Sequence, residues 1–180
     1  MKDNRISVGI IGFGTVGTGA ARILLENSDV IRERTGFDIY LKKIADLDIE
    51  RDRGIKLPEG ALTTDANALI NDPDIDIVVE LMGGIHPAKE FMLQAIKNKK
   101  HVVTANKALL ATEGNGIFSE AQKSGVEVGF EASVAGGIPI IKVLREGLVA
   151  NRIIAVYGII NGTSNYILTK MTDEKVEFSA

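Results

Sequence analysis

An apolar run over residues 6–11, followed by glycines at positions 12, 14 and 17, most constrains what this chain can fold into. The run is too short for a helix and is typical of a buried strand, whereas the apolar residues over 20–25 favour a helix. Gly12 permits a tight turn, Gly14 lets the backbone approach a pyrophosphate, and Gly17 lets the helix pack against the strand. The start of that helix offers free N–H groups to anions. The alternative is a purely structural glycine turn. We therefore predict a dinucleotide site at Gly12, Phe13, Gly14, Thr15, Val16 and Gly17.

Composition excludes several other classes of function. The 180 residues carry a net charge of −3, and no basic tract is present, so nucleic acid is not an expected partner. No apolar run reaches the length of a membrane span, so no membrane partner is expected. The N-terminal residues do not resemble a cleavable targeting segment, and we expect a cytoplasmic protein. The absence of cysteine excludes disulfides, zinc–thiolate sites and thioester chemistry with a thiol nucleophile.

Strand and helix patterns alternate over the first part of the chain. Strands are expected at 6–11, 37–45, 75–82, 101–104 and 126–130, with at most a short strand within 54–64. Helices are expected between them, including separate helical segments at 105–111 and 114–125. This alternation predicts an α/β fold of the Rossmann type, a doubly wound parallel sheet, over residues 1–133.

The pattern changes after Glu131. A loop of small residues over 132–138 precedes a helix from Pro139 to about Gly147, a strand at 153–160 and a helix capped by Thr163 or Ser164. Residues 134–180 are therefore expected to belong to a second domain.

Asp46 directly follows the second predicted strand. An acidic residue at this place in a dinucleotide fold accepts hydrogen bonds from the adenosine ribose and repels a 2′-phosphate, so we favour NAD. Asp48 is the rival for this role, and a solvated side chain is the alternative for Asp46. Arg51 and Arg53 could instead meet the 2′-phosphate of NADP, although we expect them to be exposed loop charges.

Two further positions follow predicted strands, where a parallel sheet receives its ligand. Gly83 ends the 75–82 strand, and Thr104 ends the 101–104 strand. Lys107 then falls at the end of that strand or in the first turn of the next helix. A cation is disfavoured at a helix N-terminus unless an anion is nearby, so Lys107 is a candidate functional residue rather than an ordinary surface lysine.

These residues resemble homoserine dehydrogenase. The resemblance rests on five segments in family order: Gly-Ile-Ile-Gly-Phe-Gly-Thr-Val-Gly at 9–17, Asp-Ile-Val-Val-Glu-Leu-Met-Gly-Gly at 76–84, Val-Val-Thr-Ala-Asn-Lys-Ala-Leu at 102–109, Phe-Glu-Ala-Ser-Val-Ala-Gly-Gly-Ile-Pro-Ile-Ile at 130–141, and Asn-Gly-Thr-Ser-Asn-Tyr at 161–166. It implies reversible hydride transfer between L-homoserine and L-aspartate 4-semialdehyde with NAD or NADP, in the biosynthesis of threonine, methionine and isoleucine.

The resemblance also implies roles for individual residues. Lys107 matches a lysine that lies between nicotinamide and substrate, and it is therefore implied as a cofactor-binding and catalytic residue. Main-chain oxygens of Glu131, Val134, Gly136 and Ile138 match those that hold a sodium ion in the family. The segment 161–166 matches the start of the substrate domain, which carries the sheet of a homodimer. The resemblance therefore implies that residues 134–180 begin an α+β domain for catalysis and dimerisation, of which only a truncated part is present.

The chain departs from the family in length. Family members are roughly twice as long, and their second part carries a substrate-binding glutamate and an aspartate–lysine pair. The main proton-transfer lysine is therefore expected outside residues 1–180, with little turnover by these residues alone. The rivals are another amino-acid or semialdehyde dehydrogenase of the same nucleotide fold and a dinucleotide-binding module without catalysis.

Overall fold

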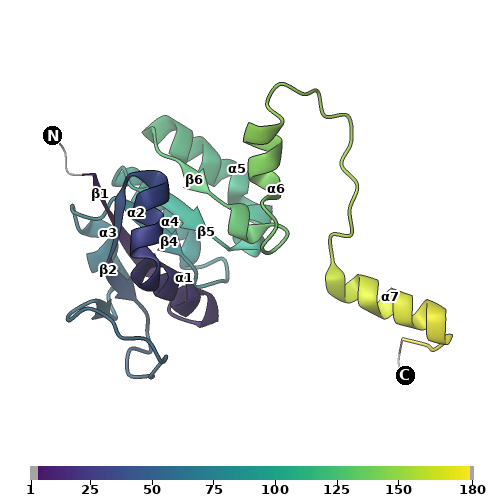
Figure 1. The fold of residues 1–180 in the computed structure, drawn as a ribbon, viewed down its shortest axis with the longest axis horizontal. Helices are drawn as coiled ribbons and strands as arrows, with labels where there is room; N and C mark the ends of the chain where they lie inside the picture. The colour runs from purple at the N-terminus through teal and green to yellow at the C-terminus, as the bar shows by residue number, and fades with distance from the viewer. Residues whose placement is uncertain (1–3, 179–180) are drawn as a thin grey trace. The chain divides into compact units, whose positions relative to one another are not determined.

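The computed structural model describes residues 4–178 (Figure 1). They form two compact units, of which the first ends at Ile138 and the second begins at Pro139. The domain boundary expected between residues 133 and 134 stays a prediction. Among residues 4–178, no helix has both the length and the apolar character that a membrane crossing needs.

The first unit is built on one six-stranded parallel sheet with the strand order β3-β2-β1-β4-β5-β6. This order and the alternation of strands with helices confirm the expected doubly wound fold. Its elements are β1 (Arg5–Ile11), α1 (Thr15–Glu26), α2 (Ser28–Thr35), β2 (Asp38–Ala45), β3 (Leu62–Thr63), α3 (Ala66–Asn71), β4 (Ile77–Glu80), α4 (Ala88–Lys97), β5 (His101–Thr104), α5 (Lys107–Ser124) and β6 (Val128–Gly129).

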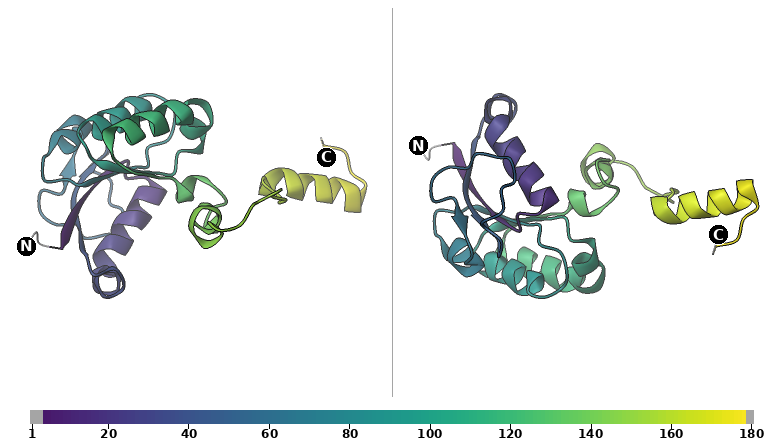
Figure 2. Two further views of the ribbon diagram at one scale, coloured as in Figure 1. Left: turned by 90° about the horizontal axis from the view of Figure 1, so that it is seen from above. Right: turned by 90° about the horizontal axis from the view of Figure 1, so that it is seen from below.

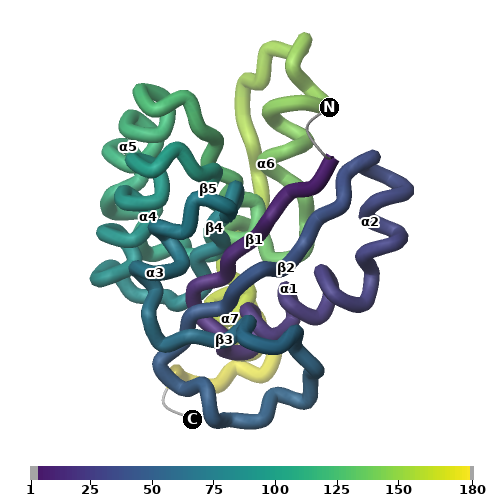
Figure 3. Tube along the Cα trace, turned by 90° about the vertical axis from the view of Figure 1, so that its left-hand side faces the viewer, coloured from purple at the N-terminus to yellow at the C-terminus, as the bar shows by residue number. Residues whose placement is uncertain are grey.

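Helices cover both faces of the sheet, with α1 and α2 on one side and α3, α4 and α5 on the other (Figures 2 and 3). β1 supplies both cores because successive side chains of a strand point to opposite faces. Val8 and Ile10 belong to the cluster that includes Ala21 of α1, whereas Ile11 belongs to the cluster that includes Met92 of α4. A strand buried on both faces explains why its apolar run is continuous rather than alternating.

Residues 107–124 form a single helix, so the expectation of separate helical segments at 105–111 and 114–125 is wrong. Gly114 would interrupt a helix on propensity alone. Here it is buried, and a Cβ at this position would come within ordinary contact distance of Phe118 and Leu110. Leu109, Ile117 and Ala121 place the same helix in the core beside α4, and this burial outweighs the low helix propensity of the glycine.

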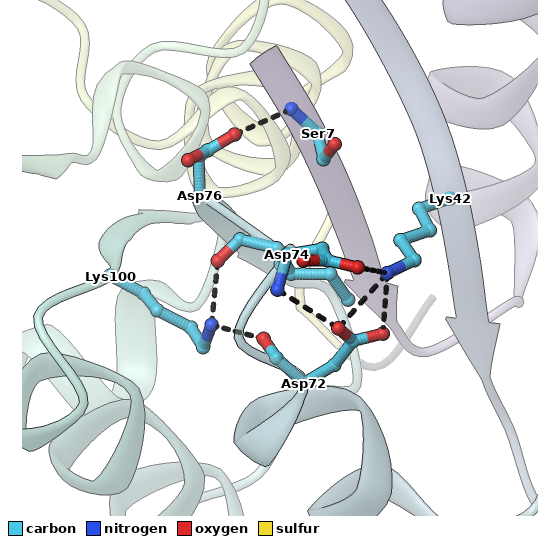
Figure 4. Close-up of polar contacts among 7 residues, drawn as sticks. Ser7, Lys42, Asp72, Asp74, Asp76 and Lys100 are labelled. Atoms are coloured by element: carbon cyan, nitrogen blue, oxygen red, sulfur yellow. Dashed lines mark hydrogen bonds and ion pairs between the residues drawn. The ribbon is translucent and has the colours of Figure 1, made fainter.

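Charged residues join the elements near the amino ends of β4 and β5 (Figure 4). Lys42 of β2 bonds the carboxylates of Asp72 and Asp74, with Nζ–O distances of 2.9–3.0 Å. The buried Lys100 donates to the main-chain oxygens of Asp72 and Ile75, each at 2.6 Å. Burial lowers the pKa of Lys100 from its ordinary value. This cluster holds the turn before β4 and lies at the end of the sheet opposite to the expected cofactor site.

The second unit contains α6 (Ile140–Lys142), which continues as a π-helical turn over Val143–Gly147, and α7 (Gly162–Glu174). The expected strand at 153–160 does not form: this segment is exposed and pairs with no strand in the described part of the chain. An isolated strand leaves its backbone groups unpaired, so its apolar pattern is not sufficient. The predicted cap of α7, Thr163 or Ser164, is also wrong, because Asn161 caps this helix by accepting a hydrogen bond from the Ser164 N–H.

Candidate functional site

The order of the strands reverses between β1 and β4, which lie side by side at the centre of the sheet. From the carboxyl end of β1 the chain enters α1 on one face, and from that of β4 it continues toward α4 on the other (Figure 3). The loops after these strands therefore diverge and leave room between them. In open α/β sheets, ligands bind in this crevice.

The three glycines of the turn after β1 have different physical requirements. Gly12 has a φ of +99°, and a Cβ there would lie 2.7 Å from the main chain of Leu81. A Cβ at Gly17 would lie 2.0 Å from the carbonyl oxygen of Gly12, so this contact between helix and turn excludes any side chain. Gly14 has an ordinary φ of −73°, and a Cβ there would meet nothing within 4 Å. The fold requires Gly12 and Gly17, whereas the open space at Gly14 fits the approach of a ligand.

Asp46 lies directly against this turn. Its Oδ2 atom accepts a hydrogen bond from the Phe13 N–H at 2.5 Å, and its Oδ1 atom accepts one from the Asp48 N–H at 2.8 Å. The structure therefore brings together the two features that the sequence singled out for binding a dinucleotide. Asp48 is exposed, and its carboxylate instead accepts from the Arg51 N–H at 3.2 Å.

Arg53 is not an exposed loop charge, contrary to expectation, because its side chain is only 10% exposed. Its guanidinium donates to the main-chain oxygens of Phe13, Arg51 and Asp48 at 2.5–2.8 Å. It also lies over the Phe13 ring, 4.6 Å from the centroid, and 3.6 Å from the Asp46 carboxylate. Arg53 thus fastens the loop after β2 to the glycine turn.

Two cavities share Gly14 and Asp46 in their walls. One cavity of about 500 Å³ extends past Thr64, Met82 and Phe91 and carries mainly apolar walls of the kind that receive a planar ring. The other, of about 520 Å³, is bounded by Thr15, Thr18, Arg51 and Arg53 among others. Val16 is 58% exposed in the first turn of α1 and lines neither cavity.

The remaining predicted cofactor and catalytic residues lie beyond the ends of β4 and β5. Gly83 has a φ of +74° and follows β4, Thr104 ends β5, and Lys107 begins α5 with an exposed side chain. Lys107 therefore occupies the first helical turn, as expected. None of the three lines either cavity.

Hydrogen bonds between buried side chains connect these positions. The Thr104 hydroxyl donates to Oε2 of Glu80 at 2.6 Å, and Oε1 of Glu80 accepts from the N–H groups of Met82 and Gly83 at 3.0 and 3.3 Å. Asn106 caps α5 by accepting from the Leu109 N–H at 3.1 Å. The sequence analysis missed Glu80, Asn106 and the anchoring role of Arg53. A polar residue at the end of an apolar strand was the available signal for Glu80.

The four predicted main-chain sodium ligands lie within one irregular segment. Glu131 starts a 3₁₀ turn over Glu131–Ser133, and its carbonyl oxygen accepts from the Val134 N–H at 3.1 Å. Ala135 and Gly136 both have positive φ, so the chain reverses before Ile138. A loop of this kind exposes carbonyl oxygens, which suit a hard cation. Over residues 4–178, no group of three or more His, Cys, Asp or Glu side chains could hold a metal.

The strand order, the glycine turn and the carboxylate at the end of β2 define a dinucleotide-binding domain of the Rossmann type. The family model described as the NAD-binding domain of homoserine dehydrogenase matches residues 12–131, and the homoserine dehydrogenase model matches residues 139–180. The chain belongs to the homoserine dehydrogenase family of oxidoreductases.

Individual relatives agree with this assignment. The chain is 52% identical to the homoserine dehydrogenase of Neisseria gonorrhoeae over 97% of its length and 46% identical to that of Bacillus subtilis over 94%. A solved homoserine dehydrogenase from Thiobacillus denitrificans is 52% identical over 97% of this chain, with a TM-score of 0.88. The chain spans 39–40% of the length of these three proteins.

Proposed function

We propose that this chain binds the nicotinamide cofactor of a homoserine dehydrogenase. The observation that carries the proposal is the open space at Gly14, beside Asp46 and the N-terminus of α1, where the strand order reverses. The first turn of α1 contains no acidic residue, and Gly14 provides no side-chain cap, so the N–H groups there remain available to phosphates. Gly12, Phe13, Thr15, Val16 and Gly17 complete the proposed pyrophosphate turn.

We propose NAD rather than NADP as the preferred cofactor. Asp46 is the expected ribose acceptor and would repel a 2′-phosphate at the same place. Arg53 supports this preference, because three of its five N–H groups already donate to main-chain oxygens of the turn and the loop. It therefore acts as an anchor of the loop rather than as a free partner for phosphate.

We propose that the reaction is the reversible hydride transfer between L-homoserine and L-aspartate 4-semialdehyde, within threonine, methionine and isoleucine biosynthesis. The nicotinamide supplies the hydride chemistry, and the protein supplies position and proton handling. Gly83, Thr104 and Lys107 are the proposed nicotinamide-side residues, with Lys107 as the proposed catalytic residue. Because the chain spans about 40% of its relatives, we assign turnover to a complete enzyme that includes further proton-transfer groups.

The family resemblance supports three further proposals. Main-chain oxygens of Glu131, Val134, Gly136 and Ile138 would hold a sodium ion. The complete enzyme would be a homodimer, and it would act in the cytoplasm. Sodium binding is testable by measuring whether sodium, but not a bulky organic cation at equal ionic strength, stabilises the fold.

Titration with NADH and NADPH tests cofactor binding. The chain contains no tryptophan, so the emission of bound NADH can be followed without that background. We expect saturable binding of NADH, displacement by NAD, and weaker binding of NADPH. Absence of saturable binding of either cofactor would overturn the proposal. Homoserine-dependent reduction of NAD at full family rates by these 180 residues would refute the assignment of proton transfer to further residues.

A further inference from the structure

Three buried residues, Glu80, Thr104 and Asn106, form a continuous hydrogen-bonded network between two loops, in which the Asn106 main-chain N–H links Asn106 to the Thr104 hydroxyl. Glu80 is 1%, Thr104 is 0% and Asn106 is 6% exposed. Glu80 contacts the N–H groups after β4, and the Asn106 amide returns to that loop by donating to the Gly84 oxygen at 2.6 Å. The network therefore joins the loop after β4 to the loop after β5 at two points, through Glu80 and through the Asn106 amide.

The direction of these hydrogen bonds can be worked out. The Thr104 oxygen accepts from the Asn106 N–H at 3.0 Å, so the hydroxyl proton of Thr104 remains available to Glu80 Oε2. Both oxygens of Glu80 thus act only as acceptors. Glutamine has the same shape, but it would place an NH₂ group against either the Thr104 hydroxyl or the two main-chain N–H groups. Turned toward Thr104, the NH₂ group leaves the Thr104 hydroxyl proton without its acceptor, and turned toward the loop it opposes two N–H donors, so glutamine cannot reproduce every hydrogen bond of the carboxylate.

We propose that Glu80 is a positioning residue that acts through Thr104 and Asn106 to fix Lys107 and the 82–84 loop relative to each other. Lys107 directly follows Asn106, and the Asn106 side chain caps the helix that Lys107 begins. Functional side chains need supporting hydrogen bonds to stay within a fraction of an ångström of the productive geometry. The role in cofactor binding rests on the proposed function of Lys107, whereas the fastening of the loops does not.

Amide hydrogen exchange of the cofactor-free chain tests the fastening. Glu80→Gln should increase the exchange of the Gly83 and Leu109 amides together, because one network protects both. Asp76→Asn is the matched control: Asp76 lies just before the other end of β4 and accepts from the Ser7 N–H at 2.8 Å. It should leave both amides unchanged. Unchanged exchange in a folded Glu80→Gln, or an increase at only one amide, would overturn the proposal.

A double-mutant cycle on NADH affinity tests the link to Lys107. Glu80→Gln and Lys107→Met should each weaken NADH binding about tenfold, as expected for the loss of a hydrogen bond to a charged group. The double variant should lose little more NADH affinity than Lys107→Met alone, because Glu80 cannot contribute through a side chain that is absent. Independent, additive effects would show that Glu80 does not act through Lys107.

Variants of Thr104 keep the proposal testable if Glu80→Gln fails to fold. Thr104→Val preserves shape and removes the hydroxyl, whereas Thr104→Ser preserves the hydroxyl. We expect Val to reproduce the exchange changes of Glu80→Gln, and Ser to leave the exchange of the Gly83 and Leu109 amides as in the wild type. Equal behaviour of the two variants would contradict the network. If the wild type binds neither NADH nor NADPH, the proposed function fails, and the exchange experiment still decides on the network.

Discussion

The Asp46 carboxylate accepts a hydrogen bond from the Phe13 N–H at 2.5 Å, which joins the end of β2 to the turn after β1. The residue that we propose to select the cofactor therefore also braces the turn that we propose to bind it. Removing the carboxylate should affect every cofactor to some extent, but not equally.

Asp46→Ala should weaken NAD(H) binding about tenfold or more, because hydrogen bonds to a charged acceptor are lost. NADP(H) should lose less, since removal of the carboxylate also removes its repulsion of the 2′-phosphate. Dissociation constants for both cofactors measure the difference. Asp48→Ala is the control and should leave the ratio unchanged. A larger loss for NADP(H) than for NAD(H) in Asp46→Ala would contradict the proposed preference.

Alanine substitutions at Gly14 and Gly17 should separate binding from folding. Gly17→Ala places a Cβ against the Gly12 oxygen and should reduce the free energy of unfolding by about 3 kcal/mol or more. Gly14→Ala should change it by less than about 0.5 kcal/mol, as for an open surface position. Gly14→Ala should nevertheless weaken NADH binding about 5- to 30-fold, equivalent to the loss of about 1–2 kcal/mol of anion binding at a helix N-terminus. Urea denaturation and NADH titration measure the two effects, and equal destabilisation by both substitutions would refute this reading.

Asp72 should make the free energy of unfolding depend on pH in the acidic range. Burial alone would raise the pKa of Asp72, but hydrogen bonds from Lys42 and the Asp74 N–H, with charge attraction, lower it below the ordinary 3.8. A carboxyl with a depressed pKa contributes stability that is complete above its unfolded-state pKa and is lost as pH falls through its folded-state pKa. The difference in unfolding free energy between wild type and Asp72→Asn should therefore be constant near neutral pH and shrink below pH 3.8.

Urea denaturation across this range measures the Asp72 contribution. Asp74→Asn is the matched control, because the Asp74 side chain is 78% exposed while contacting the same Lys42. It should cost less stability at neutral pH. A difference between wild type and Asp72→Asn that stayed the same below pH 3.8 would contradict the assignment.

Arg53→Lys should loosen the loop after β2 without unfolding the sheet. Lysine lacks the planar fork that reaches Phe13, Arg51 and Asp48 together, so the substitution is not conservative here. Amide exchange over residues 47–54 should increase, while exchange in β1 and β4 remains slow. Arg51→Lys, at an exposed side chain, should have little effect. Unchanged exchange in Arg53→Lys would show that Phe13 and Asp46 hold the loop alone.

Local sequence patterns predicted the strands and the glycine turn of the first unit, although not the single helix over residues 107–124, because the determinants of strands and turns are close in the sequence. The apolar run of β1 and the glycines after it specify a strand, a turn and a helix within about twenty residues. Asp46 directly follows the end of β2, as the sequence predicted. Glu80 and Arg53 were missed for one reason. Each acts through contacts with residues 24 and 40 positions away, Thr104 and Phe13, which no local pattern reveals.

The second unit shows the opposite limit. The apolar residues over 153–160 have strand character, and Ile154 and Ile160 are 94% and 100% exposed. A strand depends on a partner for its backbone hydrogen bonds, and residues 4–178 supply none for this segment. Local propensity therefore predicted an element whose formation is decided by other chain segments.

The attachment of the loop after β2 has a consequence for how cofactor choice can change over evolution. Between Asp46 and Ala61 the loop carries the side chains nearest to the proposed ribose position. Arg53 fastens it to the glycine turn, and Ile55 and Leu57 pack against the core that contains Ala21. Substitutions of its exposed charged residues, such as Asp48 and Arg51, would alter the charge that a bound nucleotide meets without disturbing either core. The cofactor preference that we propose would thus depend on a few exposed residues of one loop, and a change in that preference would leave both cores intact.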